Sequence, residues 1–195
     1  MRPLVFHDWR AVAATATALG ACAIVMRAVW RSRPRIAASG ADRRHLGRYT
    51  RGLTAVHLLA LGAPFAAAGL TLPGPPWPLL GAGLALYVLG QALRGWAIAT
   101  LGDWFQGALV VQIGQRVVES GPYRVIRHPA YAGGILRTAG TGLVLDNWVS
   151  LALLLLGMIA FVAVRIRREE SVLVDGLEPY TAYQRRKARL MPGIW

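Results

Sequence analysis

Cysteine and lysine are almost absent from this chain of 195 residues, which has one of each, Cys22 and Lys187. A single cysteine excludes a disulfide framework and a cluster of Cys and His metal ligands, so we expect no metal site. The GxGxxG, P-loop, GxSxG and HExxH motifs are missing as well. Their absence removes the usual signatures of dinucleotide, nucleotide, serine-hydrolase and zinc-protease sites.

Charged residues are also scarce, at 16% of the chain, whereas soluble domains have about 25%. Hydrophobic residues make up 55%, the mean hydropathy is +0.41, and several apolar runs approach 20 residues. These values indicate a protein that lies in a lipid bilayer. The net charge of +13 comes from arginines placed between the apolar runs, as in cytoplasmic membrane loops, and we therefore expect no nucleic-acid partner.

The apolar runs predict an all-α integral membrane protein with about five transmembrane helices. We expect the N-terminus outside, the C-terminus inside, and the basic segment 31–52 in the cytoplasm, because Lys and Arg favour that side. The first run is interpreted as a retained helix, since arginines follow it and no convincing cleavage site does. The expected spans are about 11–30, 53–72, 79–101, 131–145 and 148–166.

The predicted spans divide the chain into two regions. Residues 1–98 carry the first three transmembrane helices. Residues 99–195 form a candidate catalytic region, in which a polar loop at 102–130 precedes a helical hairpin and a cytoplasmic amphipathic tail. Asp146 and Asn147 supply the two-residue turn of the hairpin.

The segment GPYRVIRHPAY, 121–131, concentrates polar and conformationally restricted residues just before a membrane helix. Pro129 suits a helix start, which leaves His128 beside backbone N–H groups that have no helical partner. Such groups can bind an anion. The alternative is an interfacial cap, because His, Tyr and Arg all favour the depth of the lipid headgroups.

The segment RIRREE, 165–170, follows the last span, with Arg165 and Glu169 on one helical face where they could pair. Two acids at a helix C-terminus are unfavourable, so either the helix continues or the acids have a cationic partner. A positively charged ligand would satisfy them. The alternative is a surface ion pair, which contributes little to stability.

Arg94 and Arg137 lie inside apolar stretches. Intramembrane arginines are rare and usually face a cavity or a partner. The alternative is that both side chains reach the inner interface.

The segments GPYRVIRHPAYAGG, 121–134, and EESVLVDGLEPYTAYQRRKARLMPG, 169–193, resemble the isoprenylcysteine carboxyl methyltransferase family and its bacterial relatives. The family pattern is GxYxxxRHPxYxG, a helical hairpin, an Arg four residues before a Glu-Glu pair, and a tail with spaced tyrosines. The segment ATLGDWFQ, 99–106, resembles bacterial members too. The likeness covers 99–195.

This resemblance implies an integral membrane methyltransferase that uses S-adenosyl-L-methionine and a lipophilic acceptor, with the tail covering the cofactor. Arg165 matches the Arg that orients the acceptor. The family has a His where this chain has Gln115. The cofactor contacts implied by the motif are Gln115, Val117, Val118, Tyr123, His128, Pro129, Ala130, Tyr131 and Glu169.

The residue chemistry agrees with these roles. Glu169 can bind the cofactor's ammonium, the amides at His128–Tyr131 its carboxylate, and Tyr123 and Tyr131 its adenine or sulfonium. An acceptor carboxylate needs no general base, so catalysis reduces to alignment and exclusion of water, with Arg165 as the positioning fork. We therefore expect the site at the cytoplasmic face of a bacterial inner membrane, reached laterally by lipid.

Other acceptors and functions stay open. A phospholipid amine or a thiol could accept the methyl group. A sterol-reductase-like enzyme could bind the 2′-phosphate of NADPH, and a non-enzymatic scaffold or lipid-binding protein is a further alternative. The basic cluster suited to NADPH is Arg185, Arg186, Lys187 and Arg189.

Overall fold

The computed structural model describes residues 3–31, 40–106 and 109–193, without the side chains of 25, 28–31 and 40–50. Residues 32–39 of the predicted cytoplasmic segment 31–52 therefore lie outside the described residues, and the backbone of 40–52 is helical. The described part is all-helical, and apart from one isolated β-bridge it contains no extended pairing. The helices are α1 (Trp9–Arg31), α2 (Gly40–Ala66), α3 (Pro76–Leu101), α4 (Pro129–Val144), α5 (Trp148–Gly176) and α6 (Tyr180–Arg186), with 3-10 turns η1 (Leu4–Phe6), η2 (Gly102–Trp104) and η3 (Gly121–Arg124).

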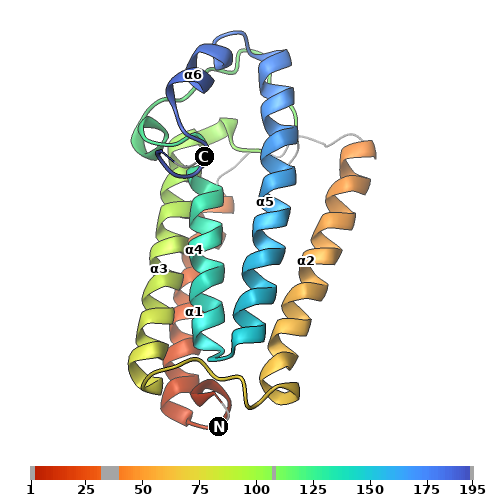
Figure 1. Cartoon of the computed structure of the whole chain (residues 1–195). Helices are drawn as coiled ribbons and strands as arrows, with labels where there is room; N and C mark the ends of the chain where they lie inside the picture. Colours follow the sequence, from red (N-terminus) through yellow and green to blue (C-terminus); the bar gives the residue numbers. More distant parts are fainter. Residues whose placement is uncertain (1–2, 32–39, 107–108, 194–195) are drawn as a thin grey trace.

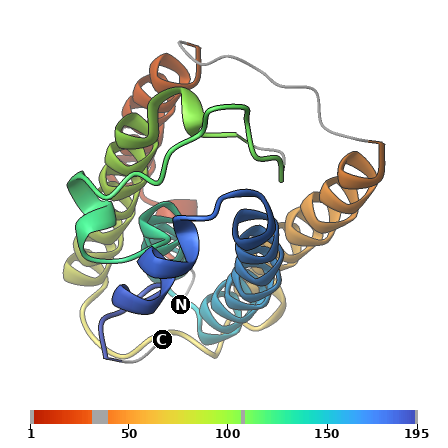
Figure 2. The same ribbon diagram turned by 90° about the horizontal axis from the view of Figure 1, so that it is seen from above.

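Five long helices form a bundle, and the loop that follows η2 gathers with η3 and α6 at one end of it (Figure 1). Seen from above, this loop and α6 lie over the ends of α3, α4 and α5 (Figure 2). α4 packs between α3 and α5, α2 packs on α5, and α1 packs on α3. The bundle thus carries a cap of loops and one short helix at a single end, which is called the capped end below.

The five bundle helices fall where the five spans were predicted, with differences in extent that are largest at α2 and α5. α2 begins at Gly40 instead of about 53, and α5 continues to Gly176, well beyond the predicted end at 166. Two helical segments, Pro76–Trp104 and Trp148–Gly176, are long and apolar enough to cross a membrane, and the apolar stretch Trp9–Ile24 is shorter. The count of five spans and their orientation stay predictions. The boundary proposed at 98/99 falls within α3.

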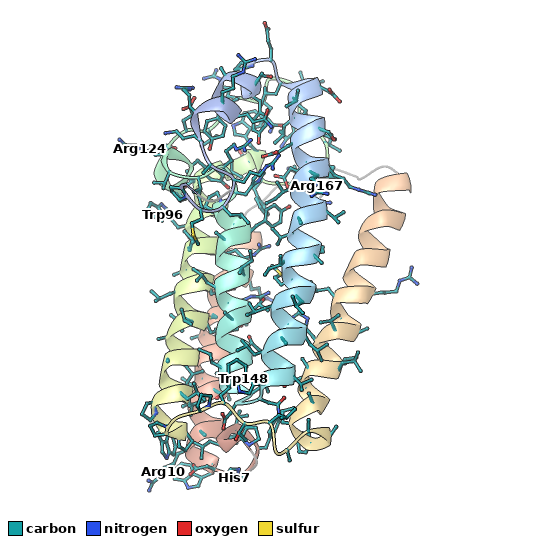
Figure 3. The ribbon with its side chains drawn as sticks, in the orientation of Figure 1. His7, Arg10, Trp96, Arg124, Trp148 and Arg167 are labelled. Carbon is teal, nitrogen blue, oxygen red and sulfur yellow. The ribbon has the colours of Figure 1, made fainter. Side chains whose placement is uncertain are left out.

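Exposed tryptophans mark both ends of the bundle. Trp96 lies toward the capped end and Trp148 toward the opposite end, and each is more than half exposed (Figure 3). Tryptophan is enriched at both membrane–water interfaces, where its ring is part apolar and part polar. This arrangement fits a bundle that lies across a bilayer with its capped end at one surface.

Glycines allow α3 and α4 to approach closely. A Cβ on Gly90 would lie 2.6 Å from the carbonyl oxygen of Gly133, and one on Gly140 would lie 2.5 Å from that of Gly83. Small residues at helix contacts let backbones meet, which is how helices associate where lipid supplies no hydrophobic drive. The seam fixes the register of α4 against α3, and with it the height of every residue at the start of α4.

The turn between α4 and α5 lies at the end of the bundle opposite the cap and connects three helices through hydrogen bonds. Asp146 has a φ of 45°, and the Asn147 side chain accepts hydrogen bonds from the backbone N–H groups of Val149 and Ser150 at 3.0 and 3.1 Å. Its amide also donates to the carbonyl of Ala67 at 2.9 Å. The predicted two-residue turn is thus an N-cap for α5 that also binds the end of α2.

A Gly90→Ala substitution is expected to destabilise the protein by about 1–3 kcal/mol, because the new methyl group must push α3 and α4 apart. Gly81→Ala in the same helix is the matched control, since nothing lies within 4 Å of its added Cβ. Thermal unfolding in detergent, followed by circular dichroism, measures both. Equal unfolding temperatures for the two variants would show that the seam is not closely packed.

Candidate active site

A cavity of about 510 Å³ opens beneath the cap and extends between the bundle helices. Its volume suits a cofactor or a drug-sized ligand. Nine of the ten residues predicted from sequence to form the site line it: Gln115, Val117, Val118, Tyr123, His128, Ala130, Tyr131, Arg165 and Glu169. Pro129 does not line the cavity, because it is buried as the first residue of α4, where its ring fits the helix start.

The cavity has two chemically different parts. Toward the cap it is lined by polar groups from the loops and α6, including Gln115, Tyr123 and Tyr180. Between the helices it is lined mainly by apolar side chains from α2 and α5, among them Leu53, Met158 and Phe161, together with Arg94 and Arg137. A ligand with a polar end and an apolar chain matches this division.

Tyr131 links two of the predicted site residues where the polar and apolar parts meet. Its hydroxyl donates to Glu169 Oε2 at 2.6 Å and accepts from Arg165 Nε at 3.2 Å. Arg165 and Glu169, which the sequence indicated could pair, are therefore bridged by the phenol. Glu169 keeps 33% of its side chain exposed, so this carboxylate remains accessible from the cavity.

The neighbouring Glu170 has the opposite environment, with 5% of its side chain exposed. Its Oε1 lies 2.8 Å from Arg127 Nη1 and accepts a hydrogen bond from His128 Nε2 at 3.0 Å. Its Oε2 accepts from Arg189 Nε at 3.0 Å. The Arg127 contact is electrostatic, since its N–H groups are not aligned for a hydrogen bond. Both conditions expected for the acid pair are met: the helix continues, and one acid has cationic partners.

The C-terminal tail is also bound to the start of α4 through the backbone. The N–H groups of Arg127 and His128 donate to the carbonyls of Ala188 and Arg189 at 2.9 and 3.0 Å, beside the parallel bridge between Ile126 and Ala188. From α6, the Tyr183 hydroxyl donates to the carbonyl of Tyr123 at 2.9 Å. These bonds hold the tail over the cavity.

Most backbone N–H groups at the start of α4 already donate hydrogen bonds within the protein. Fewer of them than predicted are therefore available to bind an anion. The tail takes the N–H of His128, Pro129 has none, and those of Tyr131 and Ala132 donate back to the His128 carbonyl. Among the amides from His128 to Ala132, the N–H of Ala130 alone lacks a partner in the described part of the chain. A ligand carboxylate would therefore meet one free amide here, where the sequence predicted several.

The loop before η3 closes the polar part of the cavity. Gln115 Oε1 accepts from the backbone N–H of Gln112 at 2.9 Å, so this side chain shapes its own turn. Val117 packs with Tyr180 and Tyr183, and Val118 packs with Tyr123. The two valines thus join the loop to the tail and to η3.

Three phenols of the cap are neutral at physiological pH. Burial raises the pKa of Tyr123 and of Tyr180 well above the usual value of a phenol, and it raises the pKa of Tyr183 to about 12. All three line the cavity. They can donate hydrogen bonds or present aromatic faces, but none is suited to act as a base.

Sequence reasoning missed the residues that hold the site together: Glu170, Arg127, Arg189 and Tyr183. The signal was present in the adjacent Glu169 and Glu170. Neighbouring positions on a helix point about 100° apart, so two acids in a row face different surroundings. The sequence does not tell which of the two faces the cavity, since that depends on where the tail returns.

Replacing Glu170 with Gln is expected to lower the free energy of unfolding by about 3 kcal/mol, because it leaves buried cations without their carboxylate. Glu169→Gln is the matched variant and is expected to change stability by less than about 1 kcal/mol, since Glu169 is partly exposed. Chemical unfolding in detergent compares them. A larger loss for Glu169→Gln would contradict the division of roles between the two acids.

Comparisons with known proteins point to one family. The sequence pattern of the isoprenylcysteine carboxyl methyltransferase (ICMT) family matches residues 83–175. The chain is 33% identical over 94 residues to the uncharacterized protein YpbQ of Bacillus subtilis, covering 48% of this chain and 56% of that protein. It is 32% identical over 121 residues to protein-S-isoprenylcysteine O-methyltransferase B of Arabidopsis thaliana, covering 60% and 61%.

A solved structure supports the same relationship. The eukaryotic intramembrane Ras methyltransferase ICMT superposes with a TM-score of 0.62 at 27% identity, over 76% of this chain and 53% of that one. The chain thus spans a little over half the length of the relatives it matches. The matched residues include α4, most of α5 and the Arg165–Glu170 segment. These matches support membership of the isoprenylcysteine carboxyl methyltransferase family, whose pattern covers a little under half of this chain.

Proposed function

We propose that the protein is a methyltransferase that uses S-adenosyl-L-methionine to methylate a lipophilic acceptor, a carboxylate as in prenylcysteine. The observation that carries this proposal is the Arg165–Tyr131–Glu169 chain at the junction of the polar and apolar parts of one cavity. It places an exposed carboxylate, suited to an ammonium, beside a guanidinium, suited to an acceptor anion. Relatives named as protein-S-isoprenylcysteine O-methyltransferases add support.

The polar part of the cavity fits the cofactor. Glu169 would hold the ammonium group, and the free N–H of Ala130 would donate to the carboxylate. Tyr123 and Tyr131 would supply aromatic faces for the adenine or the sulfonium. Gln115, Val117, Val118 and His128 would complete the walls, and Pro129 would act only by starting α4.

Catalysis would then depend on how the protein positions the acceptor relative to the methyl group. When bound, the cofactor supplies a methyl group on a sulfonium, and the acceptor oxygen displaces the neutral thioether. Arg165 would orient the acceptor, and Tyr131 would hold Arg165 and Glu169 at a fixed separation. The tail, held by Glu170 and Tyr183, would exclude water. The cavity walls need to supply no general base, because a carboxylate is already ionised at neutral pH.

The membrane would deliver the acceptor. The apolar part of the cavity lies between helices of the bundle, whereas the polar part lies under the cap. We infer that the lipid chain comes from the bilayer and the cofactor from the cytosol, with the capped end at the cytoplasmic face of a bacterial inner membrane. Figure 3 shows Arg124 and Arg167 at this end, in keeping with the excess of Lys and Arg on cytoplasmic sides.

The basic cluster that supported the reductase alternative is partly engaged within the chain. Arg189 binds Glu170, and Arg186 Nη2 lies 2.9 Å from Glu119 Oε1. Two of the four basic residues suited to a 2′-phosphate are therefore engaged by carboxylates of the chain itself. No observation favours a second function over methyl transfer.

Titration calorimetry with S-adenosylhomocysteine is expected to show binding to the purified protein. Glu169→Gln should weaken that binding about tenfold or more, because a charge-assisted hydrogen bond contributes roughly 1.5–3 kcal/mol. Glu178→Gln is the matched control, since Glu178 is exposed and does not line the cavity. Absence of binding at millimolar ligand, or equal affinities of the two variants, would refute the proposed cofactor site.

A further inference from the structure

Two buried side chains of the cavity wall carry hydrogen-bond donors that have no acceptor. Tyr180 is 5% exposed, and its hydroxyl forms no hydrogen bond in the described part of the chain. The Arg127 side chain is 8% exposed, and its Nε and Nη1 atoms form none there either. Both residues line the cavity. Buried polar groups in native proteins are almost always satisfied, so two exceptions at one cavity indicate a partner that binds in it.

The two groups belong to one neighbourhood beside the acid pair. Burial raises the pKa of Tyr180; the charge of Glu170 raises it further, that of Arg127 lowers it, and that of Glu169 raises it. The Tyr180 hydroxyl therefore lies within electrostatic range of all three side chains. A guanidinium can only donate hydrogen bonds, and a neutral phenol beside it is free to donate as well. The missing partner is thus a hydrogen-bond acceptor.

A negatively charged acceptor suits this place better than a neutral one. Glu170 is the carboxylate nearest to Arg127, and it also contacts His128 and Arg189. Arg127 therefore shares a single carboxylate with two other groups, and its Nη1 lies 2.8 Å from that carboxylate without forming an aligned hydrogen bond. A second carboxylate would give the guanidinium the aligned bonds that Glu170 does not supply.

The α-carboxylate of the cofactor has few other donors. Among the described amides from His128 to Ala132, the N–H of Ala130 alone is free, whereas a carboxylate accepts about four hydrogen bonds. An amino acid carries its ammonium and its carboxylate on one carbon, so the carboxylate must lie close to the side chain that binds the ammonium. Glu169 has that role in the proposed function, and it is one of the groups near Tyr180.

We propose that Tyr180 and Arg127 bind the α-carboxylate of the cofactor, together with the N–H of Ala130, and so select ligands that have an intact amino-acid end. This deepens the proposed function and rests on it for the identity of the ligand. Tyr180 belongs to α6 in the tail, and Arg127 precedes α4. The bound carboxylate would therefore join the tail to the bundle, in addition to the backbone hydrogen bonds that already connect them.

Titration calorimetry with two ligands isolates the carboxylate. The probes are S-adenosylhomocysteine and its decarboxylated analogue, which keeps the adenosine, the thioether and the ammonium. Wild type is expected to bind S-adenosylhomocysteine at least about tenfold more tightly than the analogue, because one hydrogen bond to a charged group has roughly that effect. Equal affinities for the two ligands would overturn the subsite.

Variants assign this preference to the two side chains. Tyr180→Phe should weaken binding of S-adenosylhomocysteine about tenfold and leave binding of the analogue within about twofold. Arg127→Lys should act in the same way, since one ammonium cannot replace a fork of donors shared between Glu170 and the ligand. Tyr87→Phe is the matched control: it removes the same hydroxyl from α3, outside the cavity, and should keep the preference. Full preference in Tyr180→Phe would overturn the subsite, and this variant decides alone if Arg127→Lys does not fold.

Thermal unfolding without ligand distinguishes a hydroxyl that binds ligand from one that holds the fold. The Tyr183 hydroxyl donates to the carbonyl of Tyr123 at 2.9 Å, so Tyr183→Phe should lower the unfolding temperature. Tyr180→Phe should leave it unchanged or raise it, because the variant removes a buried hydroxyl that has no partner in the described residues. Equal losses in the two variants would show that the Tyr180 hydroxyl is bound within the protein, and would overturn the subsite.

Hydrogen exchange measures the joining of the tail to the bundle. S-adenosylhomocysteine should slow exchange in 180–189 more than the decarboxylated analogue does at equal saturation, and Tyr180→Phe should remove the difference. Equal protection of wild type by both ligands would contradict the joining role of the carboxylate. The proposed function fails separately: absence of binding by either ligand would refute it and the subsite together, whereas binding of both ligands with equal affinity would refute the subsite alone.

Discussion

A buried carboxylate that contacts two arginines and a histidine holds the functional end of this molecule together. Glu170 comes from the last long helix, Arg127 and His128 from the segment that starts α4, and Arg189 from the tail. A buried charge is tolerated only when its partners satisfy it, so these elements are stable together and each is unfavourable alone. The tail also pairs its backbone with Arg127 and His128, and this pairing closes the cavity beneath it.

The position of Glu170 determines what its neighbours do. With Glu170 turned into the protein, Glu169 is turned toward the cavity, where Tyr131 connects it to Arg165. The glycine seam sets the height of α4 on α3 and so brings Arg94 to the same level. One structural ion cluster and one helix contact thereby place the Glu169 carboxylate and the guanidinium groups of Arg165 and Arg94 around a single cavity. That cavity has polar groups under the cap and mainly apolar side chains within the bundle. This division suits an enzyme that joins a water-soluble donor to a lipid acceptor.

Much of this arrangement could be predicted from sequence, because apolar runs and local motifs carry strong signals. The runs placed the bundle helices, the Asp146–Asn147 pair placed the hairpin turn, and the HPAY segment placed the start of α4. Nine of the residues predicted for the site line the cavity, and their roles stay predictions. The rest depends on contacts between distant residues. The end of α5 was missed because charged residues after 166 look like a tail, although Glu170 is buried by Arg127 and Arg189. The amides at the start of α4 were expected to be free, but the returning tail takes the N–H of His128, and those of Tyr131 and Ala132 donate to the His128 carbonyl.

The most direct test of the account is a structure of the protein with S-adenosylhomocysteine. The account predicts the ligand's ammonium at Glu169, its carboxylate at the N–H of Ala130, and Glu170 still bound by Arg127, His128 and Arg189 beneath the tail. It also predicts that the thioether sulfur, from which the methyl group has left, faces Arg165 and the apolar part of the cavity. A ligand bound outside this cavity, or one that contacts Glu170 in place of Glu169, would contradict it.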